Sequence, residues 1–383
     1  LFIGMTVSAE EIFRDRKLQK REKFLSLSKG SYLSSKFVLL LFISAIQTLF
    51  FILVGNSILG IESMYWRYWL VMFSTSFFAN MVGLNISNSF NSAVAIYILI
   101  PFMIIPQLIF SGVIVSFDRL NPAVSSRKVV PVIGEAMASR WAYEALMVSQ
   151  FKDNPLEKQL YPVDKKLSQI NYLKTYWISE LESQLQFIRY NLKNPESNDK
   201  INRLGKIIQN EIAQKHPGIE FPQFVFSSDF AIPNIDQKRI KKIEFYLQEY
   251  KKYLNKEFTN QSKERDRLIY NIEKTSDQDN YFNILKERYY NESLTDMVRL
   301  NNKFNKVIVI DNALVPIVDP VFRDAAGIRS HFYAGNKKLG GQLIDTFWFN
   351  VGILWCMSII MMITLYFDLF KKLVEFFEKG KKR

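Results

Sequence analysis

Apolar residues gather in long runs near both ends of the chain, and a polar middle separates them. The first run covers residues 37–61 and the last covers residues 346–367. Between Arg67 and Asp118 no position carries a charge. A helix needs about 20 apolar residues to cross roughly 30 Å of hydrocarbon, so this uncharged segment is long enough for two crossings. The pattern therefore predicts that a large part of the chain lies in a bilayer.

A polar, turn-prone stretch at residues 85–91 divides the uncharged segment into two predicted helices. Three predicted transmembrane helices, at 37–60, 68–86 and 93–116, form the block 37–117. A fourth is predicted at 344–367. We therefore expect an all-α membrane protein, in which four transmembrane helices accompany a mainly helical domain outside the membrane.

Lys and Arg residues in the short flanks predict the orientation. Residues 1–36 carry eight of them and the tail 368–383 carries six, whereas the loop 62–67 carries only Arg67. The positive-inside rule then places both termini in the cytoplasm. Four crossings return the chain to the side it left, so the helix count and the charges agree. The segment 118–343 is expected on the outer side of the membrane.

Apolar residues recur at helical spacing within this outer segment. One stripe covers residues 170–192, a second covers 240–254, and a third helical stretch is expected at 279–306. An antiparallel helical bundle with its own core explains such stripes, and a rod that reaches a partner is the alternative. Residues 306–318, rich in Val and Ile, predict a short β-like patch.

Composition excludes several classes of function. The formal charge is +13, but the outer segment mixes both signs, so no basic stripe for nucleic acid stands apart from acids. Cys356 is the only cysteine, and His216 and His331 are the only histidines, so no cluster has metal-ligand spacing. We find no Gly-rich phosphate loop and no assignable catalytic set. The sequence therefore predicts no catalytic site in this chain.

Two further features concern energy and partners. The predicted crossings hold no acidic or basic residue at their centres, which argues against ion-coupled transport. The segment 8–36 starts as a charged helix near Ser8 and breaks at Gly30 before it re-enters an apolar run. It is either an interfacial basic helix that sets the topology or a docking element for a cytoplasmic partner.

Three motifs in this order resemble the permease domain of ABC-2 type transporters, in particular the G (White) subfamily. Arg21-Glu22, Ser31-Tyr32 and Lys36 resemble that family's loop between its second and third helices. The segment Phe110-Ser-Gly-Val-Ile-Val115 is similar to its Phe-Ser-Gly element, and Ser139-Arg-Trp-Ala-Tyr-Glu-Ala-Leu146 is similar to its Pro-Arg-Trp-x-x-Glu-x-Leu element. The resemblance covers residues 1–150 and 344–383.

The resemblance implies six helices per permease half. This chain would then be the C-terminal portion of a longer protein and hold only part of those helices. Residues 1–7 look like the end of a preceding apolar helix. The resemblance also implies an ABC-type ATPase domain that binds ATP and Mg. This domain would lie in the same polypeptide or in a separate subunit. A second permease half completes a homodimer or heterodimer. No cofactor is expected in this chain itself.

The same resemblance implies roles for particular residues. The segment 1–36 would contain the coupling helix, with candidate contacts to the ATPase at Glu11, Arg14, Arg21 and Glu22. Ile104 and Leu108 would face the substrate cavity. Val113 and Ile114 match the apolar pair that forms the plug, or gate, between the inner and outer cavities.

The chain departs from the family pattern in its outer loop. Eukaryotic members carry Cys there and this loop has none, so we expect a bacterial variant in the inner membrane, with an enlarged outer loop that also leaves room for a periplasmic partner. The expected function is the permease part of an ATP-driven exporter for a hydrophobic or amphipathic substrate. The alternative is a membrane sensor or scaffold whose outer domain binds a ligand or a partner.

Overall fold

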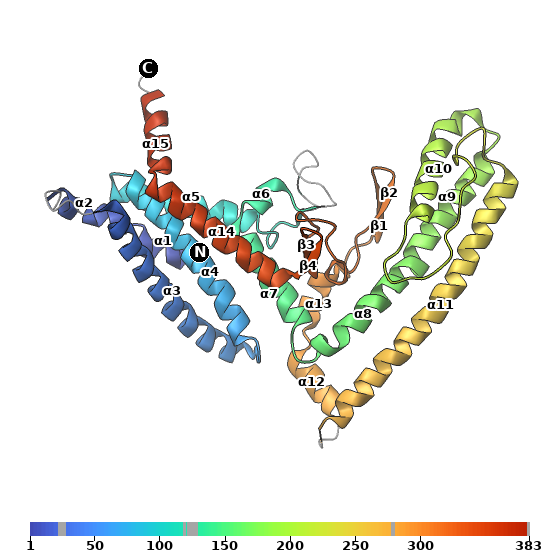
Figure 1. Cartoon of the computed structure of the whole chain (residues 1–383), viewed down its shortest axis with the longest axis horizontal. Helices are drawn as coiled ribbons and strands as arrows, with labels where there is room; N and C mark the ends of the chain where they lie inside the picture. The colour runs from blue at the N-terminus through green and yellow to red at the C-terminus, as the bar shows by residue number, and fades with distance from the viewer. Residues whose placement is uncertain (22–27, 118–119, 121–128, 277–279, 381–383) are drawn as a thin grey trace. The chain divides into compact units, whose positions relative to one another are not determined.

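The computed structural model describes residues 1–21, 28–117, 120, 129–276 and 280–380. Most of these residues are helical (Figure 1). The chain divides into two compact units. The first unit consists of Leu1–Asn154 and Asp324–Arg383, and the second is the intervening segment Pro155–Arg323.

The first unit is built from helices with one small β-hairpin. Its helices are α1 (Phe2–Ser8), α2 (Glu11–Arg21), α3 (Lys29–Leu59), α4 (Tyr65–Ser89), α5 (Ala93–Ile109), α6 (Val132–Glu135), α7 (Ala138–Lys152), α14 (Thr346–Tyr366) and α15 (Leu369–Gly380). Strands β3 (Asn336–Leu339) and β4 (Gln342–Asp345) pair antiparallel directly before α14. Among the described residues, α3, α4 and α14 are the helices long and apolar enough to span a membrane.

Helix α4 lies at the centre of the first unit and is buried along most of its length. It packs against α1, α3, α7 and α14 (Figure 1). Small and polar residues allow this close packing. A Cβ atom added at Gly83 would lie 2.1 Å from the Ser8 hydroxyl of α1, and the Asn80 side-chain amide donates to the Ser44 hydroxyl of α3 over 2.6 Å.

Helix α5 contains 17 residues and ends at Ile109, whereas the sequence predicted a crossing that continues to residue 116. Pro101 and Pro106 lie inside it, and each removes a backbone donor. The chain then enters a turn with Gly112 at φ +82°. The count of four spanning helices therefore stays a prediction, since α5 is an apolar helix shorter than the other three.

Two sequence-predicted boundaries differ from the structure. Ser8 ends α1 instead of starting the next helix. Its hydroxyl donates back to the carbonyl oxygen of Gly4 over 2.9 Å, and the first amides of α2 bond to Ser87 instead. The polar stretch 85–91 was predicted to break the uncharged segment, but α4 continues to Ser89 and the break follows at residues 90–92. The polar side chains of this stretch contact neighbouring helices, as described below.

The second unit is also mainly helical. It contains α8 (Glu157–Tyr172), the π-helical turn η3 (Leu173–Trp177), α9 (Ile178–Asn191), η4 (Pro195–Ser197), α10 (Asn198–Ala213), α11 (Gln237–Lys274), α12 (Tyr281–Tyr289), α13 (Glu292–Arg299), β1 (Val307–Ile310), β2 (Ala313–Pro316) and η5 (Pro320–Phe322). The hairpin of β1 and β2 confirms the predicted β-like patch. The stretch predicted as a third helix is divided at Asn291, whose side chain caps α13 by accepting from the Leu294 amide over 2.9 Å.

The two predicted apolar stripes meet in the core of the second unit. Residues of α8, η3 and α9 and residues of the long helix α11 belong to one buried cluster, which includes Leu181, Leu185, Ile243 and Leu247. Helix α11 packs against α8 and α9 (Figure 1). The 3.6-residue periodicity therefore identified the buried faces correctly.

Candidate functional site

The short helix α2 is fixed to the end of α4. The backbone amides of Ile12 and Phe13, in the first turn of α2, donate to the Ser87 hydroxyl over 3.1 and 2.9 Å. Amides in the first turn of a helix have no partner within that helix, and a serine just ahead of the helix usually supplies one. Here α4 supplies the serine, so the start of α2 and the end of α4 form one hydrogen-bonded unit.

Arg16 makes a second connection from α2 to α4. Its guanidinium donates to the carbonyl oxygens of Ser87 and Asn88 over 3.0 and 2.5 Å, and also to the side chain of Asn91. The carbonyls in the last turn of a helix lack partners within it, and the helix dipole favours a cation there. Arg16 therefore binds the end of α4 and the connection that leads into α5.

Lys36 connects α2 to α3. Its ammonium lies 2.7 Å from both Glu11 and Asp15 and is largely buried. The Tyr32 hydroxyl donates to Asp15 over 3.0 Å. Burial acts to raise the pKa of Asp15, but the hydrogen bonds from Lys36 and Tyr32 outweigh it and hold that pKa below its ordinary value. Asp15 is thus a carboxylate, and the contact is a charged one.

Asp368, in the turn that directly follows α14, joins the same group of contacts. This carboxylate accepts from Lys29 at the start of α3 over 2.5 Å and from Asn88 of α4 over 2.7 Å. Asn85 of α4 also donates to the carbonyl oxygen of Met361 in α14 over 2.9 Å. We call the combined set the polar hub: Glu11, Asp15, Arg16, Lys29, Lys36, Ser87, Asn88 and Asp368. It ties α2 to one end of α3, α4 and α14.

The residues predicted to contact an ATPase lie in different surroundings. Glu11 belongs to the polar hub and also pairs with Arg14 over 3.0 Å, while the Arg14 side chain is mostly exposed. Arg21 is exposed at the last position of α2. Glu22 lies outside the described residues. Sequence reasoning missed Asp15, although its i, i+4 spacing from Glu11 places both acids on one helix face.

The segment Phe110–Val115, here called the Phe-Ser-Gly turn, follows α5. The Ser111 hydroxyl donates to the Leu108 carbonyl oxygen over 2.7 Å and accepts from the Val113 amide over 3.2 Å. A Cβ atom at Gly112 would lie 2.8 Å from the ring of Phe117 and 2.9 Å from that of Phe332. The turn is therefore held by its own serine and by close packing that a side chain at residue 112 would disturb.

The structure brings together the two motifs that the sequence singled out near the third crossing. The Ser139 hydroxyl at the start of α7 donates to the Gln107 carbonyl oxygen over 2.5 Å, and the Ser139 amide donates to the Gln107 side chain over 3.1 Å. Gln107 is buried in the last turns of α5. The last turn of α5, directly before the Phe-Ser-Gly turn, is therefore anchored to the start of the Ser139–Leu146 element.

A fully buried ionic cluster lies beside this junction. Glu144 of α7 is 2.8 Å from the Lys337 ammonium of β3 and 3.3 Å from the Arg140 guanidinium. It also accepts from the side chain of Asn350 in α14 over 2.9 Å and from the backbone amide of Tyr333 over 3.1 Å. The cluster joins α7, the β3–β4 hairpin and α14.

For both Glu144 and Lys337, burial shifts the pKa in one direction and ion pairing shifts it in the other. Burial acts to raise the pKa of Glu144, but Arg140 and Lys337 overcome it and hold that pKa below its ordinary value. Burial lowers the pKa of Lys337 to about 8, although Glu144 acts against this shift. Near neutral pH the carboxylate is therefore ionised and faces two cations.

The predicted cavity and plug residues follow α5 and the turn after it. Ile104 is partly buried and packs against the apolar cluster of the first unit. Leu108, Val113 and Ile114 are exposed, with 50%, 53% and 65% of their surfaces accessible. The structure therefore exposes three of these four apolar side chains: Val113 and Ile114 within the Phe-Ser-Gly turn, and Leu108 just before it.

Within the part of the chain that the structure describes, no group of three or more His, Cys, Asp or Glu side chains could hold a metal ion. The contacts described above in the first unit are those of helix packing, hydrogen bonding and ion pairing.

Comparison with known families gives a match for the N-terminal part of the chain. Residues 1–151 match the family model described as ABC-2 type transporter. Over this range, which is less than half of the chain, the sequence is similar to the membrane domain of ABC-2 type transporters, and the match suggests the permease component of an ABC transporter. Such domains generally work with an ABC ATPase partner. The search of curated proteins and that of solved structures found no match.

Together with the apolar helices, this match points to an integral membrane protein and supports a role in transport. The matched range includes α1 to α6 and α7 except for its last residue, Lys152. It therefore contains every residue of the polar hub except Asp368. The second unit and α14 lie outside it.

Proposed function

We propose that the chain forms the permease part of an ATP-driven exporter for a hydrophobic or amphipathic substrate. The observation that supports this best is the docking of α2, a short charged helix, onto the ends of the long apolar helices. Arg16 binds the end of α4, and Lys36 of α3 binds two acids of α2. A force applied to α2 would reach α3, α4 and α5 through these contacts.

In this proposal α2 is the coupling helix, and an ABC-type ATPase that binds ATP and Mg pushes on it from the cytoplasm. The ATPase is a domain of the same longer polypeptide or a separate subunit. Its contacts would be the exposed side chains of α2, with Arg14 and Arg21 first among them. Glu11 would serve the connection to Lys36 rather than the ATPase surface, because it is occupied in the polar hub.

The experiment compares Arg16→Met with Lys256→Met in the complex purified together with its ATPase and reconstituted in liposomes. Lys256 is an exposed lysine of α11, outside the proposed ATPase contacts of α2, and serves as the matched control. We expect Arg16→Met to reduce ATP-driven dye transport by roughly tenfold while the ATPase still co-purifies, since a charged hydrogen-bond donor to two carbonyls is lost. Transport that is equal in both variants would refute the coupling role of α2.

A second permease half, as a homodimer or heterodimer, would cover the apolar surface around the Phe-Ser-Gly turn. Leu108, together with the partly buried Ile104, would then line the cavity, and Val113 and Ile114 would form the apolar plug. Val113→Ser places a hydroxyl in that plug and is expected to raise ATP hydrolysis without matching transport. If ATP turnover and transport both stay at their wild-type values, the plug assignment fails.

The direction of transport and the location of the protein in the cell are part of the same proposal. Both termini would lie in the cytoplasm of a bacterium, and the segment 118–343 would lie outside its inner membrane, where it caps the exit or docks a periplasmic partner. An exporter would load a fluorescent amphipathic dye into inside-out vesicles when ATP is added. Dye loading that needs right-side-out vesicles instead would contradict export.

A further inference from the structure

Helix α15, which follows the last long apolar helix, carries a row of exposed apolar side chains. Leu369, Leu373 and Phe376 have 47%, 53% and 73% of their surfaces accessible. They are four and three residues apart, so they lie on the same side of the helix. We call these three side chains the outer face of α15. Neither the polar hub nor the Phe-Ser-Gly turn includes them, so the permease proposal leaves this face unexplained.

A neighbouring apolar stripe of the same helix faces the protein. Phe370 is partly buried and packs against the apolar cluster of the first unit. Val374, one turn further along, is half-buried. Helix α15 packs against α4 and α14. The protein therefore covers one part of the apolar surface of α15, and the outer face lies beside that part.

Charged residues occupy the remaining side of α15. With about 3.6 residues per turn, Lys371 and Glu375 lie on the side opposite to Leu369 and Leu373. Residues 368–383 together hold six Lys or Arg and three Asp or Glu. An amphipathic helix with an excess of cations is typical of a segment that lies on an anionic membrane surface.

The position of α15 in the chain places its start at the edge of the bilayer. Helix α14 has 21 residues, which gives a length of about 31 Å and matches a hydrocarbon core of about 30 Å. Only Phe367 and Asp368 separate α14 from α15. With α14 as a spanning helix, α15 therefore begins where the hydrocarbon ends.

The turn between the two helices is held in place by the polar hub. Asp368 has a φ of +53°, and its carbonyl oxygen accepts from the Lys372 amide over 2.9 Å in the first turn of α15. Its carboxylate accepts from Lys29 of α3 and Asn88 of α4. These bonds fix the start of α15 to the ends of α3 and α4, so the helix cannot move away from the membrane edge as a whole.

Exposed apolar side chains continue from α14 into α15. On α14, Ile359, Ile363 and Tyr366 are about half exposed and follow the same spacing of four and three residues. A spanning helix presents such side chains to lipid. The next exposed apolar residues are Phe367 and Leu369, the first residue of α15. This continuity favours lipid as the partner of the outer face.

We propose that the outer face of α15 inserts into the membrane interface beside α14, while Lys372 binds the headgroups of anionic phospholipids. Projection of α15 into water would leave three large apolar side chains hydrated, and deeper insertion would bury its charges. The proposal requires only that α14 spans the membrane. It does not depend on the direction of transport or on an ATPase partner.

The test measures the depth of nitroxide spin labels by electron paramagnetic resonance, with the full chain in lipid nanodiscs. Oxygen, which concentrates in hydrocarbon, and a water-soluble nickel chelate are the two relaxing agents. Cys356, an exposed residue of α14 and the only cysteine, is labelled in one sample as the reference for the bilayer interior. In a Cys356→Ser background the label is placed by Leu373→Cys or by Lys372→Cys.

We expect the label at residue 373 to lie about 5–10 Å below the lipid phosphates and the label at residue 372 to lie in water. Equal access of the nickel chelate to both labels would show that α15 projects from the membrane and would overturn the proposal. A label at residue 373 that neither agent reaches would mean that protein covers the outer face, which also overturns it.

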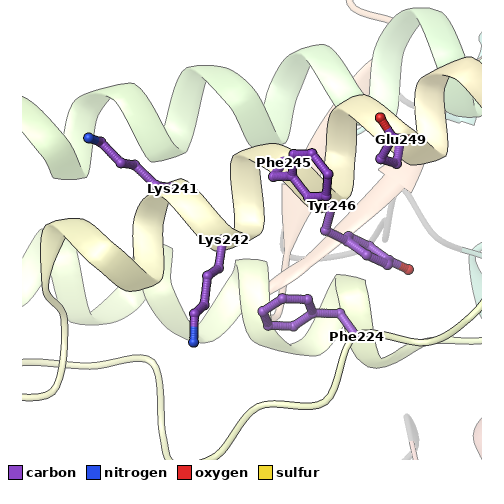
Figure 2. Close-up of a pocket in the computed structure, with 6 residues that line it drawn as sticks. All are labelled: Phe224, Lys241, Lys242, Phe245, Tyr246 and Glu249. Carbon is purple, nitrogen blue, oxygen red and sulfur yellow. The ribbon is translucent and has the colours of Figure 1, made fainter.

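Helix α11 of the second unit offers a matched control. Figure 2 shows Phe245 on α11 together with Lys241 and Lys242 of the same helix. Phe245 is 65% exposed, and both lysines are exposed. This patch has the same chemistry as α15 but does not continue a spanning helix. We expect a label placed by Phe245→Cys to lie in water, and a label there below the phosphates would refute the argument from continuity.

The role of anionic lipid is tested with nanodiscs of phosphatidylcholine alone and with added phosphatidylglycerol. One lysine near an anionic surface is expected to change the ratio of inserted to non-inserted α15 about fivefold. Lys372→Gln should therefore lower that ratio in the anionic nanodiscs, whereas Lys242→Gln should leave it unchanged. A ratio that is the same in both lipid compositions would overturn the binding of anionic headgroups.

Discussion

Glu144 is the residue on which the buried ionic cluster depends. It faces two cations, Arg140 and Lys337, and all three side chains are fully buried. The three guanidinium nitrogens of Arg140 have no hydrogen-bond partner, so its ion pair with Glu144 and its stacking on Trp141, with the guanidinium carbon 3.8 Å from the ring centroid, are its main stabilising contacts. Removing the acid is therefore worse than removing either base.

This asymmetry gives a prediction for stability. Glu144→Gln removes the acid that pairs directly with both buried cations and leaves only Glu135 nearby, so it is expected to lower the free energy of unfolding by about 3–5 kcal/mol. Lys337→Met removes one cation while Glu144 keeps Arg140 and Asn350, so the expected loss is only about 1–2 kcal/mol. Denaturant titration in mixed micelles measures both losses. A loss for Lys337→Met that equals or exceeds that for Glu144→Gln would contradict this account of the cluster.

Lys337 also makes stability depend on pH. Its pKa is about 8 in the folded protein and ordinarily 10.5. Between these values the unfolded chain binds more protons than the folded one, so this group makes the free energy of unfolding rise with pH. We expect wild type to gain stability relative to Lys337→Met as the pH increases from about 8 to 10.5. Denaturant titrations of both proteins across that window measure the difference in the free energy of unfolding. If wild type lost stability relative to Lys337→Met as the pH rises, the pKa of Lys337 would be raised, not lowered, by folding.

At the scale of elements, the sequence predicted helix type better than helix ends. The apolar run 93–116 fits a spanning helix by composition, but prolines and the turn at Gly112 end α5 at Ile109. The stretch 85–91 contains turn-prone residues, yet Ser87 and Asn88 remain helical because α2 and Asp368 satisfy their polar groups. Such tertiary partners are invisible in local propensity.

The Phe-Ser-Gly turn permits a direct test of close packing. Gly112 and Gly60 both have positive φ, +82° and +65°, but only Gly112 has rings where a Cβ atom would lie. Gly60→Ala is expected to cost about 1 kcal/mol from backbone strain alone. Gly112→Ala is expected to cost about 1–3 kcal/mol more, because Phe117 and Phe332 must move. Denaturant titration compares the two variants, and equal losses would show that the rings adapt without cost.

At the scale of the molecule, the sequence predicted the broad class from simple physics. The long uncharged segment predicted that the chain lies in a membrane, and helical periodicity predicted the core of the second unit. Three short motifs indicated a permease, and the family match covers residues 1–151. The polar hub was not predicted, because it joins residues as distant in sequence as Lys29 and Asp368. Nor was the pairing of Glu144 with Lys337, which only the folded chain brings together.

The central claim is that an ABC-type ATPase acts on this membrane domain through α2. The most direct measurement places the photo-crosslinker p-benzoylphenylalanine at Arg21, exposed at the end of α2, in cells that produce the whole protein, and identifies the crosslinked peptides by mass spectrometry. The same crosslinker at Tyr190 of α9, which is 82% exposed, serves as the control. We predict crosslinks from position 21, and none from position 190, to peptides of an ATPase with a phosphate-binding loop. Crosslinks from position 21 to a kinase or cyclase domain, or only to lipid, would contradict the account.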